Sequence, residues 1–331
     1  MAASSSTQQE QSSVNQDQEP IISAKALTIK FGHETAVQEV TFDIPRGKIF
    51  GFIGPSGSGK TTTVRLLTGF YRPTSGDVVV LGRSPVDFDA EVRAQIGYMP
   101  QQFVLYPELT VWENINFAAS IYGMRFDRTE RLNYLLDFVQ LGEHKQKLAR
   151  NLSGGMKRRL SLAATLVHSP ELIFLDEPTA GIDPVLRRKM WDHFKALQDQ
   201  GCTLFITTQY VGEAAYCDYV GVMAQGRLLM VETPDGLRRQ AFGGEVIDLH
   251  TKERLNFKDR KNLRKLPFIK GKVKPIDDNG VRIIVDEAST AIPTLLTWCQ
   301  QEYVTVESIE EYLPPFDDVF VELVKELPGD D

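Results

Sequence analysis

The chain lacks long hydrophobic runs and has only three cysteines among its 331 residues. A helix that crosses a bilayer needs about 20 consecutive apolar residues. No stretch of the sequence approaches that length, so we expect any membrane role to depend on a partner protein. Cys202, Cys217 and Cys299 are scattered without the spacing of a metal site. Their distribution favours a reducing compartment over a disulfide framework.

Positive charge is also scarce. The chain has 37 Lys and Arg residues against 44 Asp and Glu residues, which gives a formal net charge of -7. A protein that binds nucleic acids generally carries a basic face, so this balance argues against a nucleic-acid partner. Hydrophobic residues make up 42% of the sequence, which is enough for about two ordinary domains with sizeable cores.

Changes in pattern divide the chain into three segments. Residues 1–20 are rich in Ser and Gln and lack both the basic start and the apolar stretch of a signal peptide, so we predict a disordered tail. Residues 21–238 begin with β-like runs and continue with apolar runs that alternate with helical stretches. This pattern predicts an α/β fold, in which an antiparallel β subdomain accompanies a parallel sheet with crossover helices. In residues 239–331 the strand signals restart, which predicts a small α+β accessory domain.

A mostly helical stretch interrupts the α/β pattern at about residues 102–168. Thr110 and Glu113 have the spacing of a capping box near its start. We therefore predict a helical subdomain inserted into the sheet. In the accessory domain, the dipeptide Asn279-Gly280 lies between two alternating apolar runs and predicts a β-hairpin turn.

The stretch GPSGSGKTT, which starts at Gly54, matches the phosphate-loop pattern G-x-x-x-x-G-K-[ST] and stands between a predicted strand and a predicted helix. Its glycines allow backbone N–H groups to turn toward phosphates, Lys60 can reach the β- and γ-phosphates, and the Thr61 hydroxyl can bind Mg²⁺. The alternative is a glycine-rich turn that binds nothing. The predicted nucleotide-binding residues are Gly54, Pro55, Ser56, Gly57, Ser58, Gly59, Lys60, Thr61 and Thr62.

Two carboxylates follow an apolar strand in the stretch ELIFLDEPTAG. Asp176 and Glu177 come directly after the run that ends at Leu175. Ligands of open α/β sheets bind at the carboxyl ends of the strands. We therefore predict that Asp176 binds Mg²⁺, directly or through water, and that Glu177 polarises the attacking water in phosphoryl transfer. A pair of solvated turn acids is the alternative, and the preceding apolar residues disfavour it.

The stretch LSGGMKRR contains a second, incomplete anion site. Ser153, Gly154 and Gly155 precede an apolar-periodic run, so they predict a helix start whose free N–H groups suit an anion. No lysine of the phosphate-loop kind follows these glycines.

The order of these motifs resembles the ATP-binding subunits of ABC transporters over about Ile22 to Gly236. The resemblance implies ATP and Mg²⁺ as cofactors and a head-to-tail dimer that encloses two ATP molecules. Ser153 and Gly155 would then face the γ-phosphate held by Lys60 of the other subunit. One chain carries every half-site element, so we expect a dimer of identical chains.

The resemblance also implies roles for three further residues. Phe31 would stack on adenine, although a core residue at a strand end is the alternative. Gln101 would sense Mg²⁺ and the attacking water, with the neighbouring Gln102 as the alternative. Asp183 would belong to the loop that links the two active sites of the dimer, and it also has the position of a helix N-cap before Pro184.

The chain departs from the family pattern at two positions. Met156 stands where glutamine is commoner, which removes one polar contact to nucleotide. Gln209 stands where the family usually has histidine, and it can donate a hydrogen bond to the γ-phosphate without carrying charge. A hydrogen bond to a charged group is worth about 1.5–3 kcal/mol, so weakening it costs roughly ten- to hundredfold in rate. We therefore expect an active ATPase, and a nucleotide sensor without turnover is an alternative that only Gln209 favours.

Three stretches resemble the export branch of the family, namely LSGGMKRR, ITTQY and PPFDDVFVELVKE. In that branch the ATPase is a separate polypeptide that docks on a membrane-spanning subunit, so we expect a location at the cytoplasmic face of the membrane through such a partner. The alternative is a soluble ATPase switch that acts on a ribosome or a nucleic-acid assembly. The single ATPase module and the acidic balance count against it.

Overall fold

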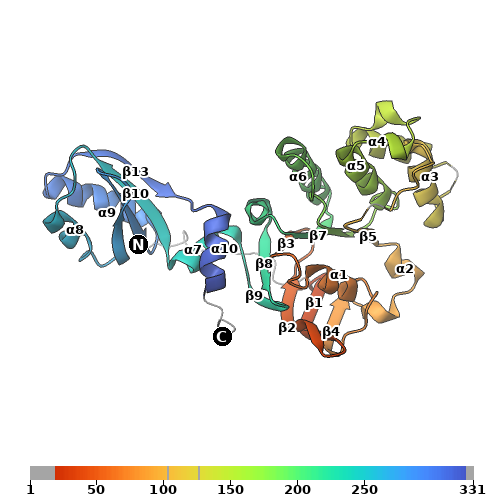
Figure 1. Ribbon diagram of the computed structural model, residues 1–331, viewed down its shortest axis with the longest axis horizontal. Helices are drawn as coiled ribbons and strands as arrows, with labels where there is room; N and C mark the ends of the chain where they lie inside the picture. The colour runs from red at the N-terminus through yellow and green to blue at the C-terminus, as the bar shows by residue number, and fades with distance from the viewer. Residues whose placement is uncertain (1–18, 103, 126, 326–331) are drawn as a thin grey trace, which may run out of the picture.

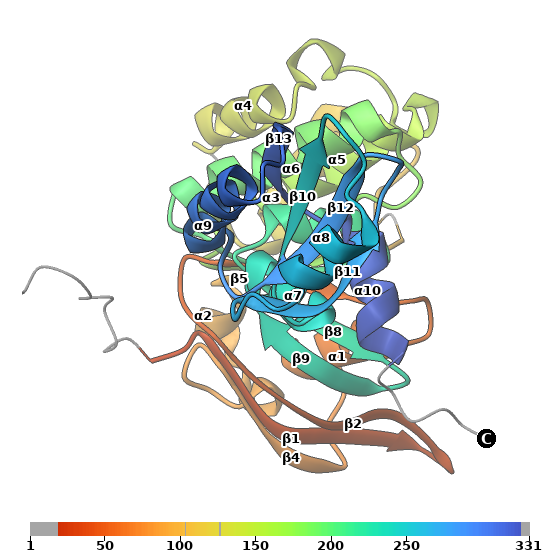
Figure 2. The same cartoon turned by 90° about the vertical axis from the view of Figure 1, so that its left-hand side faces the viewer.

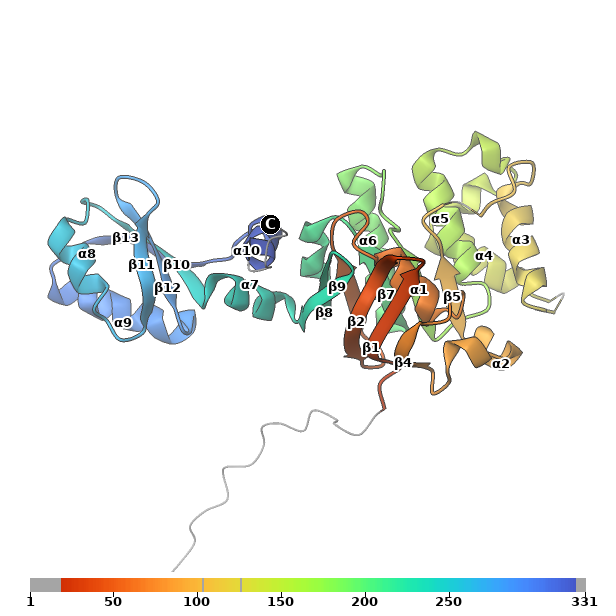
Figure 3. The same cartoon turned by 60° about the horizontal axis from the view of Figure 1, so that its bottom comes forward.

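The computed structural model describes residues 19–102, 104–125 and 127–325. The tail predicted for residues 1–20 lies outside the described residues up to residue 18. A larger N-terminal part and a smaller C-terminal part are joined by helix α7 (Pro234–Phe242), as Figures 1 and 3 show.

The centre of the larger part is a six-stranded sheet in which only the edge strand β9 pairs in the antiparallel direction. The side chains of its inner strands alternate between two buried faces, as the two-residue period of a strand requires. Ile49 and Ile53 join one hydrophobic cluster, and Phe50 and Phe52 join another. In spatial order the strands are β5 (Ile96–Met99), β6 (Leu172–Asp176), β7 (Thr203–Thr208), β3 (Ile49–Ile53), β8 (Tyr219–Ala224) and β9 (Arg227–Glu232).

An antiparallel three-stranded sheet covers one face of the central sheet, and Figure 2 shows it below the helices of the other face. Helix α1 shares its hydrophobic cluster, which includes stacked rings of Phe42 and Phe50 and of Phe50 and Phe205. The elements on this side are β1 (Ile22–Phe31), β2 (Glu34–Ile44), β4 (Ser75–Val80), α1 (Lys60–Leu67), η1 (Pro85–Asp87) and α2 (Ala90–Arg93).

Helices cover the opposite face. The helical insert lies between β5 and β6, where the sequence predicts it, and the predicted capping box is present because the Thr110 and Glu113 side chains each accept the other's backbone N–H. The elements of this side are α3 (Val111–Ile121), α4 (Thr129–Phe138), η2 (Gly142–His144), η3 (Ala149–Asn151), α5 (Gly154–Thr165), α6 (Pro184–Asp199) and η4 (Val211–Tyr216).

The C-terminal part has a β-α-β-β-α-β order and an antiparallel sheet with the strand order β11-β12-β10-β13. Its own hydrophobic cluster lies between the sheet and its helices. The hairpin predicted at Asn279-Gly280 is present, and the Asp277 side chain accepts both N–H groups of that dipeptide. The elements are β10 (Glu245–Thr251), α8 (Phe257–Leu263), β11 (Ile269–Pro275), β12 (Gly280–Val285), α9 (Ala288–Gln301) and β13 (Val306–Tyr312). The predicted fold class, α/β with an antiparallel subdomain, a helical insert and a C-terminal α+β unit, is confirmed.

Helix α10 (Phe316–Lys325) returns from the C-terminal part to the larger one. Phe316, Val319 and Leu323 belong to the hydrophobic cluster of the larger part, and α10 contacts both α7 and η4. The Arg238 guanidinium lies 4.1 Å from the centroid of the Phe316 ring. The domain boundary at residue 238 stays a prediction. Helix α10 follows that boundary in the sequence but packs on the part of the chain that precedes it.

Among the helices in the part of the chain that the structure describes, none combines the length and the apolar character that a membrane span requires.

The packing of α10 predicts an effect on the stability of the larger part. Replacing Leu323 by Ala removes a buried side chain from that core, and we expect a loss of about 2 kcal/mol in the free energy of unfolding. Val321 of the same helix is 51% exposed, so Val321→Ala is the matched control and should change stability by less than about 0.5 kcal/mol. Chemical denaturation followed by tryptophan fluorescence measures both; equal effects would contradict the packing.

Candidate functional site

The loop between β3 and α1 adopts a conformation that depends on its glycines. Gly57 and Gly59 have φ angles of 79° and 100°, a region that residues with a Cβ rarely adopt. A Cβ on Gly54 would collide with the carbonyl oxygen of Met223 on β8. The loop therefore lies close to the neighbouring backbone and leads directly into the N-terminus of α1, where backbone N–H groups favour an anion.

Lys60 is buried at the start of α1. Its Nζ donates to the carbonyl oxygens of Gly54 and Pro55, both at 2.9 Å, and lies 3.7 Å from Oε1 of Glu177. Burial lowers the pKa of the Lys60 ammonium, and the carboxylates of Glu177 and Asp176 oppose that shift. The lysine is thus folded onto its own loop, next to the carboxylate at the end of β6.

Asp176 is buried at the end of β6 and receives two hydroxyl groups. Thr61 Oγ1 donates to its Oδ1 at 3.0 Å, and Thr207 Oγ1 donates to the same oxygen at 2.6 Å. Thr207 is the register partner of Asp176 on β7. Thr207 is not among the predicted site residues, although the hydroxyls of the stretch ITTQY indicate that polar side chains end this strand.

Glu177 leaves the strand in a left-handed backbone conformation with a φ of 47°. Its N–H donates to the Thr207 backbone oxygen at 3.1 Å and to the Thr207 hydroxyl at 3.0 Å. Gln101 Nε2 donates to Glu177 Oε2 at 2.8 Å. Gln102 has an exposed side chain and does not line the cavity described next, so the contact distinguishes the two glutamines.

A cavity of about 560 Å³ lies in front of this cluster. Phe31, at its rim, is 45% exposed and makes an edge contact with Tyr71, so it is not a core residue. The turn between β8 and β9 contributes Gln225 and Gly226, and the Gly226 N–H donates to the Ser58 carbonyl. The lining comprises Phe31, Glu34, Thr35, Ala36, Ser56, Gly57, Gly59, Lys60, Thr61, Thr62, Gln101, Glu177, Gln225 and Gly226. The segments 34–36 and 225–226 were not predicted, because no motif marks them.

Three predicted segments lie outside that lining. Ser153 caps α5, where its Oγ accepts the Met156 N–H at 3.3 Å, and Gly154 and Gly155 form the first turn. Asp183 caps α6 by accepting the Leu186 N–H at 2.9 Å. The predicted residues of these segments that do not line the cavity are Ser153, Gly154, Gly155, Asp183 and Gln209.

The N-termini of α5 and α6 lie against each other. A Cβ on Gly155 would meet the end of the Leu186 side chain, so Leu186 packs directly on that glycine. Gln209 follows the end of β7 with an exposed side chain. The Gly54 N–H donates to the carbonyl oxygen of Thr208 at 3.3 Å, which places Gln209 beside the start of the phosphate-type loop.

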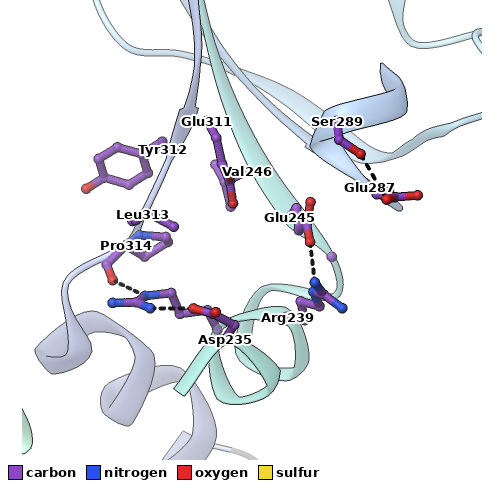
Figure 4. Close-up of a pocket in the computed structure, with 12 residues that line it drawn as sticks. Asp235, Arg239, Glu245, Val246, Glu287, Ser289, Glu311, Tyr312, Leu313 and Pro314 are labelled. Carbon is purple, nitrogen blue, oxygen red and sulfur yellow. Dashed lines mark hydrogen bonds and ion pairs between the residues drawn. The ribbon is translucent and has the colours of Figure 1, made fainter. Parts of the chain in front are cut away.

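A second cavity, of about 430 Å³, lies at the junction with the C-terminal part, and Figure 4 shows its lining from α7, β10, β13 and the start of α9. Arg239 pairs with Glu245 at 2.7 Å, and Arg238 donates to the Pro314 carbonyl and to Asp235. None of the predicted site residues lines it. The cavity at the phosphate-type loop is therefore the candidate site.

Comparison with known protein families and sequences gives several matches. Residues 37–180 match the family model described as ABC transporter. A probable multidrug ABC transporter ATP-binding protein of Escherichia coli is 40% identical over 231 residues, which are 70% of this chain and 40% of that protein. The chain thus spans less than half the length of that relative. A linearmycin resistance ATP-binding protein of Bacillus subtilis is 34% identical, over 69% of this chain and 74% of that protein. Nod factor export ATP-binding protein I of Ralstonia nicotianae is 34% identical, over 70% of this chain and 73% of that protein.

Two solved structures have the same fold. The structure of an ATP-binding subunit of an ABC transporter is 29% identical, with a TM-score of 0.61, over 67% of this chain and 93% of that one. A dimeric ATP-binding cassette in a post-hydrolysis state, bound to ADP and phosphate, is 26% identical, with a TM-score of 0.59, over 64% of this chain and 98% of that one. These likenesses agree with the predicted fold class.

The position of Thr207 predicts a cost for removing its hydroxyl. In Thr207→Val, the buried Asp176 oxygen loses a donor and the Glu177 N–H loses an acceptor, so we expect a loss of about 1–3 kcal/mol in the free energy of unfolding. Thr207→Ser keeps the hydroxyl and should recover most of that loss. Urea denaturation at fixed pH compares them. Equal destabilisation by Val and Ser would assign the effect to packing of the methyl group instead.

Proposed function

The chain belongs to the family of ABC transporter ATP-binding proteins, and we propose that residues 21–238 bind and hydrolyse ATP to power export through a separate membrane-spanning protein. The observation that carries the proposal is the hydrogen-bonded cluster at the loop. Three segments of the chain bring Lys60 and Thr61, Gln101, and Glu177 to one cavity. Asp176 lies next to that lining and accepts the Thr61 hydroxyl.

The donor set fits Mg²⁺ and a nucleotide phosphate. The Thr61 hydroxyl and the Asp176 carboxylate lie 3.0 Å apart, and oxygen ligands of this kind are those that Mg²⁺ prefers. Thr61, Asp176 and Gln101 would hold the ion, directly or through water. When bound, Mg²⁺ neutralises charge on the phosphates.

The protein residues would then divide the work of hydrolysis. Lys60 and the loop N–H groups bind the phosphates, which requires Lys60 to exchange its two carbonyl contacts for phosphate oxygens. Glu177 orients the attacking water and accepts its proton, and Gln101 holds the Glu177 carboxylate in place through the 2.8 Å hydrogen bond. Gln209 donates a hydrogen bond to the γ-phosphate without adding charge. Phe31 stacks on adenine at the rim of the cavity.

The site is completed by a second copy of the chain in this proposal. Ser153, Gly154, Gly155 and Asp183 do not line the cavity of their own chain, yet they form two exposed helix N-termini that suit an anion or a facing loop. A head-to-tail dimer of identical chains gives these residues a role at the partner's nucleotide. The dimeric cassette among the related structures supports this arrangement.

A groove beside the site supports the proposal that a membrane-spanning protein docks on the chain. It encloses about 890 Å³ between α1, α2, β5 and α3, and Phe70 and Ile121 at its edge are 73% and 67% exposed. Strand β5 contributes Tyr98 to the groove and leads directly to Gln101. The lining residues are Arg65, Thr68, Gly69, Phe70, Phe88, Ala90, Arg93, Ala94, Ile96, Tyr98, Ile121 and Tyr122.

An exporter subunit that docks in this groove would hold the chain at the cytoplasmic face of the membrane. The related proteins are named for multidrug transport, linearmycin resistance and Nod factor export. These names favour export over a soluble switch on a nucleic-acid assembly. Each name gives a different molecule or class of molecule, so the names do not agree on what is exported.

The proposed chemistry predicts ATP hydrolysis by the purified chain in the presence of Mg²⁺. Glu177→Gln should keep ATP binding and lower the hydrolysis rate by about 10²- to 10⁴-fold, because the water loses its base. Chelation of Mg²⁺ should abolish the activity of the unchanged protein. Gln102→Ala is the control and should hydrolyse ATP at the rate of the unchanged protein. If the unchanged protein hydrolysed ATP no faster than Glu177→Gln, the proposal would be contradicted.

The groove predicts the position of the partner. A tagged chain, purified from gently solubilised native membranes, should bring down a protein with several long apolar spans that mass spectrometry identifies. Phe70→Asp together with Ile121→Asp should lose that protein, because two charges enter an apolar contact. Phe257→Asp is the control, because it changes a similarly exposed residue of the C-terminal part. This variant should still bring down the membrane protein. If the groove variant still brought down the membrane protein, the partner would dock elsewhere on the chain. If only ribosomal proteins came down with the unchanged chain, export would be contradicted.

A further inference from the structure

The proposed mechanism gives no role to Glu213, although this residue is only 2% exposed. Glu213 lies in η4, after the segment that carries Gln209, and it does not line the nucleotide cavity. A carboxylate that is withheld from water is costly unless the protein supplies partners. The partners of Glu213 therefore indicate what it does.

Two side chains contact the Glu213 carboxylate, and a third packs on one of these two. The buried Thr179 hydroxyl donates to Oε1 at 2.7 Å. Arg187 Nε lies 3.6 Å from the same oxygen. The Arg187 guanidinium carbon also lies 3.9 Å from the centroid of the Tyr210 ring, which is within the range of a cation–π interaction. The cluster thus joins residues that are distant in the sequence.

Each partner of Glu213 lies on a segment that carries a residue of the proposed ATP site. The segment after β6 carries Glu177, the first turn of α6 is capped by Asp183, and the segment after β7 carries Gln209. The Arg187 N–H donates to the Asp183 carbonyl oxygen at 2.9 Å. Glu213 is therefore the buried group that the three segments have in common.

We infer that Glu213 is a positioning residue for ATP hydrolysis, which holds the segments of Glu177, Asp183 and Gln209 at a fixed spacing through Thr179 and Arg187. This inference rests on the proposed function. The hydrogen bond from Thr179 to the Glu213 carboxylate is charge-assisted and so stronger than a neutral one, and the Arg187 guanidinium adds an ion pair at 3.6 Å. A small misplacement of groups that act on the attacking water is costly, because rate depends steeply on their alignment.

The kinetic test compares Glu213→Gln with a matched buried acid. Glu213→Gln keeps an acceptor for Thr179 but loses the attraction to Arg187. We expect kcat for ATP hydrolysis to fall about tenfold, with KM for ATP within about twofold, because Lys60 and the loop are not in the cluster. Asp248 of the C-terminal part is also buried and makes two hydrogen bonds to Arg282. Asp248→Asn controls for loss of a buried ion pair and should leave kcat unchanged. A fall in kcat in both variants, or in neither, would overturn the inference.

A double variant tests whether Glu213 acts through Gln209. The combination of Glu213→Gln with Gln209→Ala should lose less rate than the product of the two single losses, since part of the Glu213 effect acts through Gln209 and coupled residues are not additive. Rates that multiply would show independent effects and would contradict positioning through Gln209.

Hydrogen exchange separates this inference from the proposed function, because it needs no hydrolysis. In the nucleotide-free protein, Glu213→Gln should raise amide exchange in residues 177–183, 184–188 and 208–213 together, while exchange in the C-terminal part stays unchanged. A rise confined to η4 would overturn the positioning role. If the unchanged protein failed to hydrolyse ATP, the proposed function would fall, while the exchange result would still decide whether Glu213 holds the segments together.

Discussion

The hydrogen bonds that Asp176 accepts at the buried end of β6 hold the site together. A buried carboxylate must find its partners within the protein, and here one oxygen receives Thr61 from α1 and Thr207 from β7. Thr207 also accepts the Glu177 N–H, which fixes the direction in which the chain leaves the strand. The phosphate-type loop and both carboxylates are therefore placed by one chain of hydrogen bonds. Loss of Thr61 or of the Thr207 hydroxyl takes one of its hydrogen-bond partners from a buried polar group.

The local elements were predictable where one segment carries its own signal. Thr110 and Glu113 form the capping box that their spacing indicates. The phosphate-type loop follows from its glycines and Lys60. Thr207 was not predictable in the same way, because its contact with Asp176 depends on the register between β6 and β7. The lining by Gln225 and Gly226 likewise depends on where a distant turn lies, which no local pattern encodes.

Helix α10 shows the same limit at the level of domains. Its position in the sequence assigns it to the accessory domain predicted for residues 239–331. The structure instead packs Val319 and Leu323 into the core of the larger part. Periodicity identifies which face of a helix is buried, but not which of two cores receives it. The chain therefore enters the C-terminal part after α7 and leaves it before α10, and these two helices contact each other.

The first turn of α6 connects the helical insert to the end of β7. Leu186 packs against Gly155 at the start of α5, and its neighbour Arg187 contacts both Glu213 and Tyr210. The turn thus touches the insert on one side and the Glu213 cluster on the other. A displacement of the insert relative to the sheet must carry this turn with it or break one of the two contacts. Because packed side chains have discrete arrangements rather than a continuous range, a movement that begins at the groove beside α3 would reach the Gln209 segment as a change of contact at Arg187.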